Sequence, residues 1–332
     1  MVKKGDRPCP KVTIIGNTSW GNTLAALLSG RGAEVKLWTR SEAEAKELNR
    51  GRHSYFSTSQ IGEALSGADL VIWVVPSQKL RENVSQARDY LSNSMLLMSA
   101  AKGLEVDSGK RMSQVLAEEI SPSLRGQICV LSGPNLAGEI ARGLPAGSVI
   151  AAQDMASAEK AQKLMESPKF VVSTSDDVVG VELGGALKNV IALGAGMIDG
   201  LGLGDNAKGA YIAWGWSEVV SLGEALGARE GTFYDLAGLG DLITTCASTL
   251  SRNHYVGYEL ARGRSLSDIS ASMKYVAEGV ATTVAAHRLA KDHGLRLPII
   301  NFIHGILFEG LTPDRAVSGF GELAASHCCA LD

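Results

Sequence analysis

Near the N-terminus, residues 12–21 read VTIIGNTSWG. The first four residues are all β-branched and three of them are apolar, which predicts a strand buried on both faces of a parallel sheet. Glycines at 16 and 21 follow, and the next residues have the spacing of a helix. A strand, a glycine-containing turn and a helix in this order form the first unit of doubly wound α/β domains, where a dinucleotide pyrophosphate binds at the helix N-terminus.

One position departs from the G-x-G-x-x-G fingerprint of such turns. Thr18 stands where the middle glycine lets the loop approach the pyrophosphate. Because a β-branched residue disfavours positive φ and would crowd the phosphates, Thr18→Gly is expected to leave dinucleotide binding unchanged or to tighten it. A strand–turn–helix with no cofactor is the alternative. The position at the first strand of a domain, with a second strand at the expected interval, favours a dinucleotide.

Short apolar, β-branched runs recur through the first half of the chain, with helix-length segments such as 22–31 and 41–50 between them. After about residue 177, helical spacing replaces the strand pattern. The predicted strands are 12–15, 34–38, 70–75, 95–99, 128–131, 149–152 and 170–173, and the predicted helices of the second half are 181–197, 207–226, 252–262 and 280–291. We therefore predict a doubly wound, Rossmann-type α/β domain over residues 1–178 and an all-helical domain over residues 179–332.

Composition limits the kinds of partner. The 332 residues are 45% hydrophobic and 20% charged, with a net charge of -3, which argues against a dedicated nucleic-acid binder. An anionic substrate would therefore need a local cluster of cations. The five cysteines form no CxxC pair, and no metal-ligand spacing is present. With no signal peptide and no unbroken apolar run of about 18 residues, we expect no membrane span and a cytoplasmic location.

The end of the second predicted strand bears on cofactor choice. Residues 39–41 contain no Asp or Glu to bind a free ribose hydroxyl. Arg40 is placed to pair with a 2′-phosphate instead, which predicts NADPH in preference to NADH. The alternative is that Arg40 is a solvated side chain beside Glu42 and Glu44.

Two lysines are candidates for chemistry. Lys102 directly follows a predicted strand, at the sheet edge where open α/β folds bind ligands. Lys188 stands in a helix of apolar and small residues, where burial would lower the pKa of its ammonium toward the range useful for proton transfer. The alternative for Lys188 is a side chain that extends to solvent.

A phosphate cradle is predicted in the second half. Ser251 is a natural N-cap for the helix at 252–262, which begins with Arg252 and Asn253. Amide donors, the helix dipole and a guanidinium at one helix N-terminus favour an anion, although an ordinary capped surface helix has the same pattern. Nearby, Asp241 and Thr245 are four residues apart and would share one helical face.

With these segments in view, the chain resembles bacterial NAD(P)-dependent glycerol-3-phosphate dehydrogenases over nearly its whole length. Blocks 16–21, 102–103, 132–134, 182–189, 200–208, 240–246, 251–253 and 277–279 carry the resemblance. It implies an oxidoreductase that uses NADPH to reduce dihydroxyacetone phosphate, a small phosphorylated substrate, to sn-glycerol 3-phosphate, the precursor of glycerophospholipids. The sequence does not decide whether the chain forms a homodimer.

The resemblance also implies residue roles. Lys188 would exchange the proton at the substrate oxygen, Lys102 would contact substrate and cofactor, and Asp241 and Thr245 would orient the lysines and the substrate hydroxyls. The remaining substrate site would be lined by Gly133, Asn135, Ser251, Arg252 and Asn253, and the dinucleotide would contact Gly16, Ser19, Trp20, Gly21, Arg40, Lys102, Ala137, Arg252, Val276 and Glu278.

Two departures from the family pattern stand out. Thr18 replaces the usual glycine, and Asn135-Leu136 stands where the family usually has Ser or Thr followed by Phe. A dehydrogenase of the same architecture acting on a 3-hydroxy acid or sugar acid is one alternative, but it gives no reason for the cradle at 251–253. A non-catalytic nucleotide-sensing protein is another, suggested by Thr18 alone. The presence of both lysines together with Asp241 argues against that second alternative.

Overall fold

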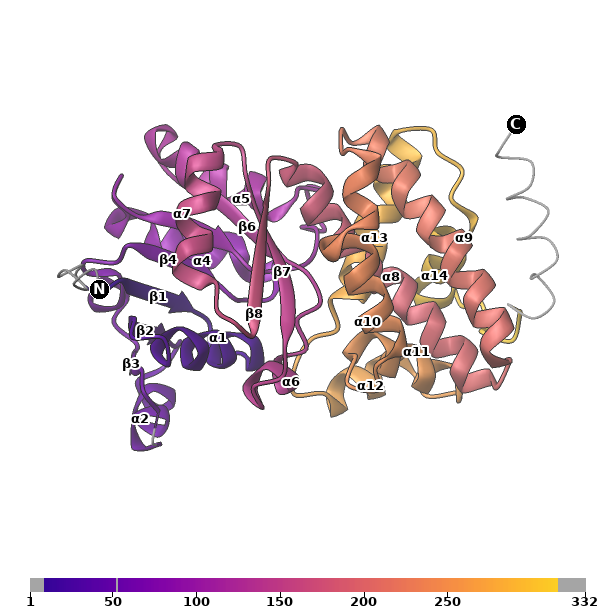
Figure 1. Ribbon diagram of the computed structural model, residues 1–332. Helices are drawn as coiled ribbons and strands as arrows, with labels where there is room; N and C mark the ends of the chain where they lie inside the picture. The colour runs from indigo at the N-terminus through magenta and orange to yellow at the C-terminus, as the bar shows by residue number, and fades with distance from the viewer. Residues whose placement is uncertain (1–8, 52, 316–332) are drawn as a thin grey trace.

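The computed structural model describes residues 9–51 and 53–315 (Figure 1). Its first part is a sheet in the order β3-β2-β1-β4-β5-β6-β7-β8, parallel throughout except where β7 pairs with β6. The strands are β1 (Lys11–Ile15), β2 (Glu34–Trp38), β3 (Phe56–Thr58), β4 (Leu70–Trp73), β5 (Leu96–Ser99), β6 (Ile128–Ser132), β7 (Ala146–Ala152) and β8 (Phe170–Ser175). The predicted doubly wound, mostly parallel sheet is confirmed.

Helices cover both faces of this sheet. One face packs against α1 (Ser19–Ser29), α6 (Ala137–Ala141) and α7 (Met155–Met165), and the other against α3 (Ile61–Leu65), α4 (Leu80–Ala87) and α5 (Met112–Glu119). Helix α2 (Glu42–Arg50) connects β2 to β3. In β4, Leu70 and Ile72 belong to the first core and Val71 and Trp73 to the second, because successive strand residues point to opposite faces. Every residue of β4 must therefore be apolar, because the strand is buried on both of its faces.

The second part is helical and is built around α8 (Val178–Leu201), as Figure 1 shows. Around it lie α9 (Gly204–Ala225), α10 (Asp241–Ala247), α11 (Arg252–Ala261), α12 (Leu266–Ser272), α13 (Glu278–Asp292) and α14 (Pro298–Phe308). Among the described residues, α8 is the one helix long and apolar enough to cross a membrane, but 94% of its apolar window is buried inside the protein. Its apolar character is therefore that of a core helix.

Local differences from the prediction have local causes. Strand β3 was not predicted, because its three residues, Phe-Ser-Thr, contain only one apolar side chain. The run predicted at 70–75 ends at Trp73, and the strand predicted to start at 149 begins at Ala146. Helices α10, α12 and α14 were also missed. The sheet ends at Ser175 and α8 begins at Val178, while the division into domains at residue 178 stays a prediction.

Glycines allow α8 and α11 to pack closely. A Cβ atom added at Gly257 would lie 1.8 Å from the Leu193 carbonyl oxygen, and one at Gly196 would lie 2.0 Å from the His254 carbonyl oxygen. Both neighbours are backbone atoms, so the helices themselves would have to move. This contact holds α11, which carries the predicted cradle, against α8, which carries Lys188.

We expect Gly257→Ala to lower the free energy of unfolding by about 1–3 kcal/mol, the usual cost of overpacking a core. The matched control is Gly209→Ala in α9, where an added Cβ meets nothing within 4 Å. There alanine should be neutral or stabilising, because it favours helix more than glycine does. Urea unfolding of the three proteins measures both changes. Equal stability of the two variants would contradict the close-packing interpretation.

Candidate active site

A cleft of about 460 Å³ lies where the carboxyl ends of β1, β4, β5 and β6 face the helical part. Ligands bind at this edge in open α/β sheets. The predicted residues that line it are Ser19, Trp20, Lys102, Asn135, Ala137, Lys188, Thr245, Ser251, Arg252, Asn253, Val276 and Glu278. Gly16, Gly21, Arg40, Gly133 and Asp241 are not part of its lining. Two sequence halves therefore contribute to one cavity.

The turn between β1 and α1 needs both of its glycines. Gly16 has φ +124°, and a Cβ there would lie 2.5 Å from the Val74 carbonyl oxygen. A Cβ at Gly21 would lie 2.2 Å from the Gly16 carbonyl oxygen. Thr18, however, has φ −112° and ψ 164°, which is ordinary extended backbone. The expectation that position 18 strains a β-branched residue is therefore wrong.

The first turn of α1 suits an anion. Within the described part of the chain, no hydrogen bond engages the backbone amides of Ser19 and Trp20. Both residues line the cleft, and the positive end of the helix dipole lies there. The turn is therefore compatible with the pyrophosphate of a dinucleotide.

Arg40 is exposed just beyond β2 and outside the lining of the cleft. None of the hydrogen bonds or ion pairs among residues 9–51 and 53–315 holds its side chain. Glu42, offered as a neighbour in the solvated alternative, pairs instead with Lys46 at 2.6 Å. No carboxylate in the described part of the chain therefore competes for the guanidinium of Arg40.

A buried carboxylate joins the two lysines at the base of the cleft. Asp241, the first residue of α10, accepts from Lys188 Nζ at 2.7 Å through Oδ1 and from Lys102 Nζ at 2.8 Å through Oδ2. Lys188 also donates to Thr245 Oγ1 at 2.5 Å, and Lys102 to the Gly133 carbonyl oxygen at 2.6 Å. One negative charge thus serves two ammonium groups, which leaves a positive site for an anionic oxygen.

Lys188 lies inside the protein rather than extending to solvent, with only 6% of its surface exposed. Burial lowers the pKa of Lys188 to about 8, and the positive charge of Lys102 acts in the same direction, while Asp241 opposes the change. An ammonium with this pKa can give up and regain a proton near neutral pH.

The helix N-terminus of α11 forms the far end of the cleft. Ser251 caps it by accepting the His254 amide at 3.2 Å, and Arg252 is exposed to the cleft with its guanidinium 5.9 Å from the centre of the Tyr275 ring. Loss of solvent lowers the pKa of Arg252, with the nearby Glu278 opposing that change. Within the described residues, the backbone amides of Arg252 and Asn253 have no acceptor, so a guanidinium beside them fits a phosphate.

Asn253 turns out to join three helices. Its Nδ2 donates to Asn189 Oδ1 at 2.7 Å, and its Oδ1 accepts the Gly279 amide at 2.9 Å. These bonds tie α11 to α8 and α13. Sequence reasoning missed Asn189, although it directly follows Lys188 and is a polar residue in the same apolar helix.

Asn135 presents an unpaired donor. Its Oδ1 accepts from Ser148 Oγ at 2.8 Å, which fixes the amide, while its Nδ2 is buried and has no partner among the described residues. Leaving a buried donor unpaired costs about 1–3 kcal/mol, so an acceptor on a bound ligand would relieve that cost. The lining of this part of the cleft therefore fits a polar ligand.

Glu278 belongs to the wall that the dinucleotide was predicted to contact. The backbone amide of Ser77 donates to its Oε1 at 3.0 Å, and the Ser77 hydroxyl donates to its Oε2. Burial raises the pKa of Glu278. The contact joins the turn after β4 to the start of α13. Ser77 was not predicted, because its partner is 201 residues away in the sequence.

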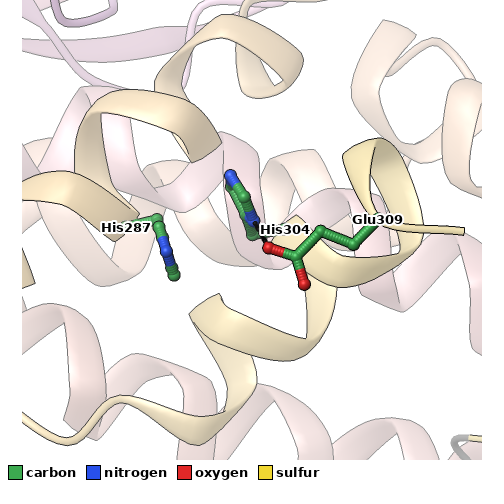
Figure 2. Close-up of side chains that lie close together, drawn as sticks. All are labelled: His287, His304 and Glu309. Atoms are coloured by element: carbon green, nitrogen blue, oxygen red, sulfur yellow. Dashed lines mark ion pairs between the residues drawn. The ribbon is translucent and has the colours of Figure 1, made fainter. Parts of the chain in front are cut away.

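A separate cluster of possible metal ligands, His287 on α13, His304 on α14 and Glu309 just after α14, lies in the helical part (Figure 2). His304 lies between His287 and Glu309, with the two imidazole rings stacked at 4.0 Å and 13°. His287 Nδ1 meets Asn301 Oδ1 at 2.9 Å, and His304 Nδ1 lies 3.0 Å from Glu309 Oε1. Because imidazole lone pairs lie in the ring plane, stacked rings do not aim at a common point. Sequence reasoning had not singled out this cluster.

Comparisons with known proteins agree over most of the chain. Models described as the NAD-dependent glycerol-3-phosphate dehydrogenase N-terminus and C-terminus match residues 11–158 and 177–318. A glycerol-3-phosphate dehydrogenase (NAD(P)+) of Dehalococcoides mccartyi is 50% identical over 330 residues, covering 96% of this chain and 92% of the relative. One of Pelotomaculum thermopropionicum is 43% identical, covering 96% and 94%. The crystal structure of glycerol-3-phosphate dehydrogenase from Coxiella burnetii has a TM-score of 0.88 at 31% identity, covering 95% and 99%.

Proposed function

The chain belongs to the NAD-dependent glycerol-3-phosphate dehydrogenase family, and from that premise we propose how its cleft performs the reaction. The protein is an oxidoreductase that uses NAD(P)H to reduce dihydroxyacetone phosphate to sn-glycerol 3-phosphate. The observation that carries the mechanism is the buried Asp241 carboxylate, bonded to both Lys188 and Lys102 at the base of the cleft. A cytoplasmic location stays a prediction.

Lys188 is the proton donor in this proposal. When bound, the reduced nicotinamide supplies a hydride to the carbonyl carbon of the substrate. The Lys188 ammonium gives its proton to the carbonyl oxygen as negative charge develops there, so the C=O group becomes CH–OH. Lys102, the second ammonium, stabilises that charge without giving up its proton. Asp241 holds both nitrogens in place and lowers the repulsion between them.

The substrate phosphate would bind at the other end of the site. Arg252 and the amides of the first turn of α11 would hold it, with Ser251 fixing that turn. Binding energy from the phosphate can then orient a very small reacting group against Lys188. Asn253 supports this arrangement by holding α11 against the helix that carries Lys188.

The test is direct. NADPH absorbance is followed after adding dihydroxyacetone phosphate, and in parallel after adding a panel of 3-hydroxy acids and sugar acids with the oxidised cofactor. We expect turnover of dihydroxyacetone phosphate alone. Turnover of a panel acid without turnover of dihydroxyacetone phosphate would favour the related-dehydrogenase alternative, and no turnover with retained nucleotide binding would favour a sensor.

A pH profile should report the state of Lys188. Reduction needs its ammonium form, so kcat for reduction should be level below pH 8 and fall about tenfold per unit well above it, given a pKa of about 8. Oxidation of glycerol 3-phosphate needs the neutral amine, so its kcat should rise through the same pH. Stopped-flow measurement of the hydride-transfer rate in both directions, as a function of pH, checks these two expectations. Two profiles that bend in the same sense would contradict the assignment.

We propose that Arg40 sets a preference for NADPH over NADH. Its guanidinium has no competing carboxylate among the described residues and follows the strand end where the ribose would lie. Arg40→Ala should weaken NADPH binding about tenfold or more and leave NADH binding within twofold. Arg50→Ala, an exposed arginine at the far end of α2, is the control. Dissociation constants for each protein are measured by titration with each nucleotide. Tighter binding of NADH than of NADPH by the unmodified protein would refute the preference.

A further inference from the structure

Thr18 does more in the dinucleotide turn than the glycine of the fingerprint can do. Its hydroxyl accepts a hydrogen bond from the Gly21 amide at 3.0 Å, which makes it the N-cap of α1. The same hydroxyl donates to the Val74 carbonyl oxygen at 3.1 Å, just beyond the end of β4. One side-chain atom therefore connects the first helix to a neighbouring strand.

The backbone of Thr18 is held as well. Its amide donates to the Gly16 carbonyl oxygen at 2.9 Å, and its own carbonyl oxygen accepts both the backbone amide and the side-chain amide of Asn22, each at 2.9 Å. The Asn22 side chain also donates to Asn17 Oδ1 at 2.8 Å. Both the side chain and the backbone of Thr18 are therefore held by hydrogen bonds within this turn.

This arrangement determines which donors face the cleft. The Gly21 amide is taken by Thr18, whereas the amides of Ser19 and Trp20 have no acceptor in the described part of the chain. With Thr18 extended, its hydroxyl fills the role of an N-cap without requiring the left-handed backbone that glycine permits. A glycine here would leave the Gly21 amide uncapped and would add backbone freedom to the turn.

We propose that Thr18 is a positioning residue for the dinucleotide, because its hydroxyl holds the turn in the form that presents the Ser19 and Trp20 amides before the cofactor arrives. The inference rests on the proposed placement of the pyrophosphate at this turn. A turn that is already ordered loses little conformational entropy when the dinucleotide binds. Binding is therefore tighter than it would be to a flexible turn. The earlier expectation is reversed: Thr18→Gly weakens dinucleotide binding.

The test compares Thr18→Ser, which keeps the hydroxyl, with Thr18→Ala and Thr18→Gly, which lack it. Dissociation constants for NADPH and NADH are measured by titration of protein fluorescence. We expect Thr18→Ser to bind both within about threefold of the unmodified protein, and Thr18→Ala to bind both about 3- to 30-fold more weakly, the range for losing an N-cap to alanine. Thr18→Gly should also bind both more weakly, because it loses the bond to the Val74 carbonyl and adds backbone freedom. At saturating nucleotide, kcat should be unchanged in all three, because Thr18 contacts no reacting atom.

Ser265→Ala is the matched control. Ser265 caps α12 through the same kind of bond, from the Asp268 amide to a serine hydroxyl at 3.1 Å, outside the cleft. Its loss should reduce stability without changing either dissociation constant. Equal binding by Thr18→Ala and Thr18→Ser, or a fall in kcat at saturation without weaker binding, would overturn the proposal.

Hydrogen exchange separates this inference from the proposed function. In the nucleotide-free protein, the Gly21 amide should exchange faster in Thr18→Ala than in Thr18→Ser, because only serine can still cap it. Equal exchange would refute the cap whatever the protein binds. If the unmodified protein bound neither nucleotide while the exchange difference held, the placement of the dinucleotide would be wrong and the cap would stand as structural only.

Discussion

Replacing Lys188 with methionine is expected to lower kcat for dihydroxyacetone phosphate reduction at least about 100-fold, the lower end for losing a general acid. Methionine nearly matches the length of lysine and suits a site with 6% exposure, so the packing of α8 should survive. Asp241 keeps Lys102 as its partner and is not left unpaired. Dissociation constants for NADPH should change by less than about threefold, since Lys188 acts on the substrate oxygen.

The control for this variant is Lys208→Met. Lys208 is partly buried and, like Lys188, is bonded to a carboxylate, in its case Asp199 at 2.6 Å, but it lies outside the lining of the cleft. Its loss should leave kcat within about threefold. Turnover of Lys188→Met within tenfold of the unmodified protein, with the fold intact by circular dichroism, would remove Lys188 from the mechanism.

Arg252→Ala is expected to lower kcat/KM for dihydroxyacetone phosphate on the order of 10- to 150-fold, which corresponds to about 1.5–3 kcal/mol for a lost charge-assisted contact. Unphosphorylated dihydroxyacetone lacks the anion that the guanidinium would hold, so its turnover should change little. The ratio of the two substrates is therefore the informative quantity. It cancels any general effect of the variant on folding or on nucleotide binding.

Arg262→Ala, at the other end of α11, serves as the control because its guanidinium bonds to the Tyr258 hydroxyl and lies over the Tyr258 ring, outside the lining of the cleft. It should leave both substrates unaffected. Adding inorganic phosphite with unphosphorylated dihydroxyacetone gives a second readout, since a separate anion should stimulate the unmodified protein and not Arg252→Ala. An equal loss for both substrates would mean that Arg252 supports the cofactor or the fold rather than the phosphate.

The sheet was predictable because its strands depend on local composition. In β4, four consecutive apolar residues are needed to fill both cores, and such a run is visible in one sequence. Strand β3 was missed because it is short and partly polar, and its pairing with β2 comes from the sheet rather than from its own residues. The antiparallel direction of β7 also depends on how the chain returns, which no local pattern records.

Some residues of the candidate site were likewise predictable from local sequence, and others were not. A lysine in an apolar helix, a capped helix beginning with arginine, and a glycine turn after the first strand are each local signals, and all of them reach the cleft except the glycines themselves. Ser77 gave no such signal, since its importance comes only from Glu278. Arg40 lies at the end of β2, as the sequence pattern predicted. Its contact with a nucleotide stays a prediction.

The sequence by itself determined the kinds of group present and their order along two differently patterned halves, because burial and helix or strand periodicity are properties of neighbouring residues. Only the tertiary structure decided which groups meet. Asp241 reaches Lys188 across 53 residues and Lys102 across 139, and these pairings set the charge of the site. Burial of Lys188, also a result of the tertiary structure, lowers its pKa to about 8. In the sequence Thr18 is a departure from the fingerprint, whereas in the fold its hydroxyl reaches the Val74 carbonyl, 56 residues away. A hydrogen bond depends on distance and direction in space, which separation along the chain does not encode.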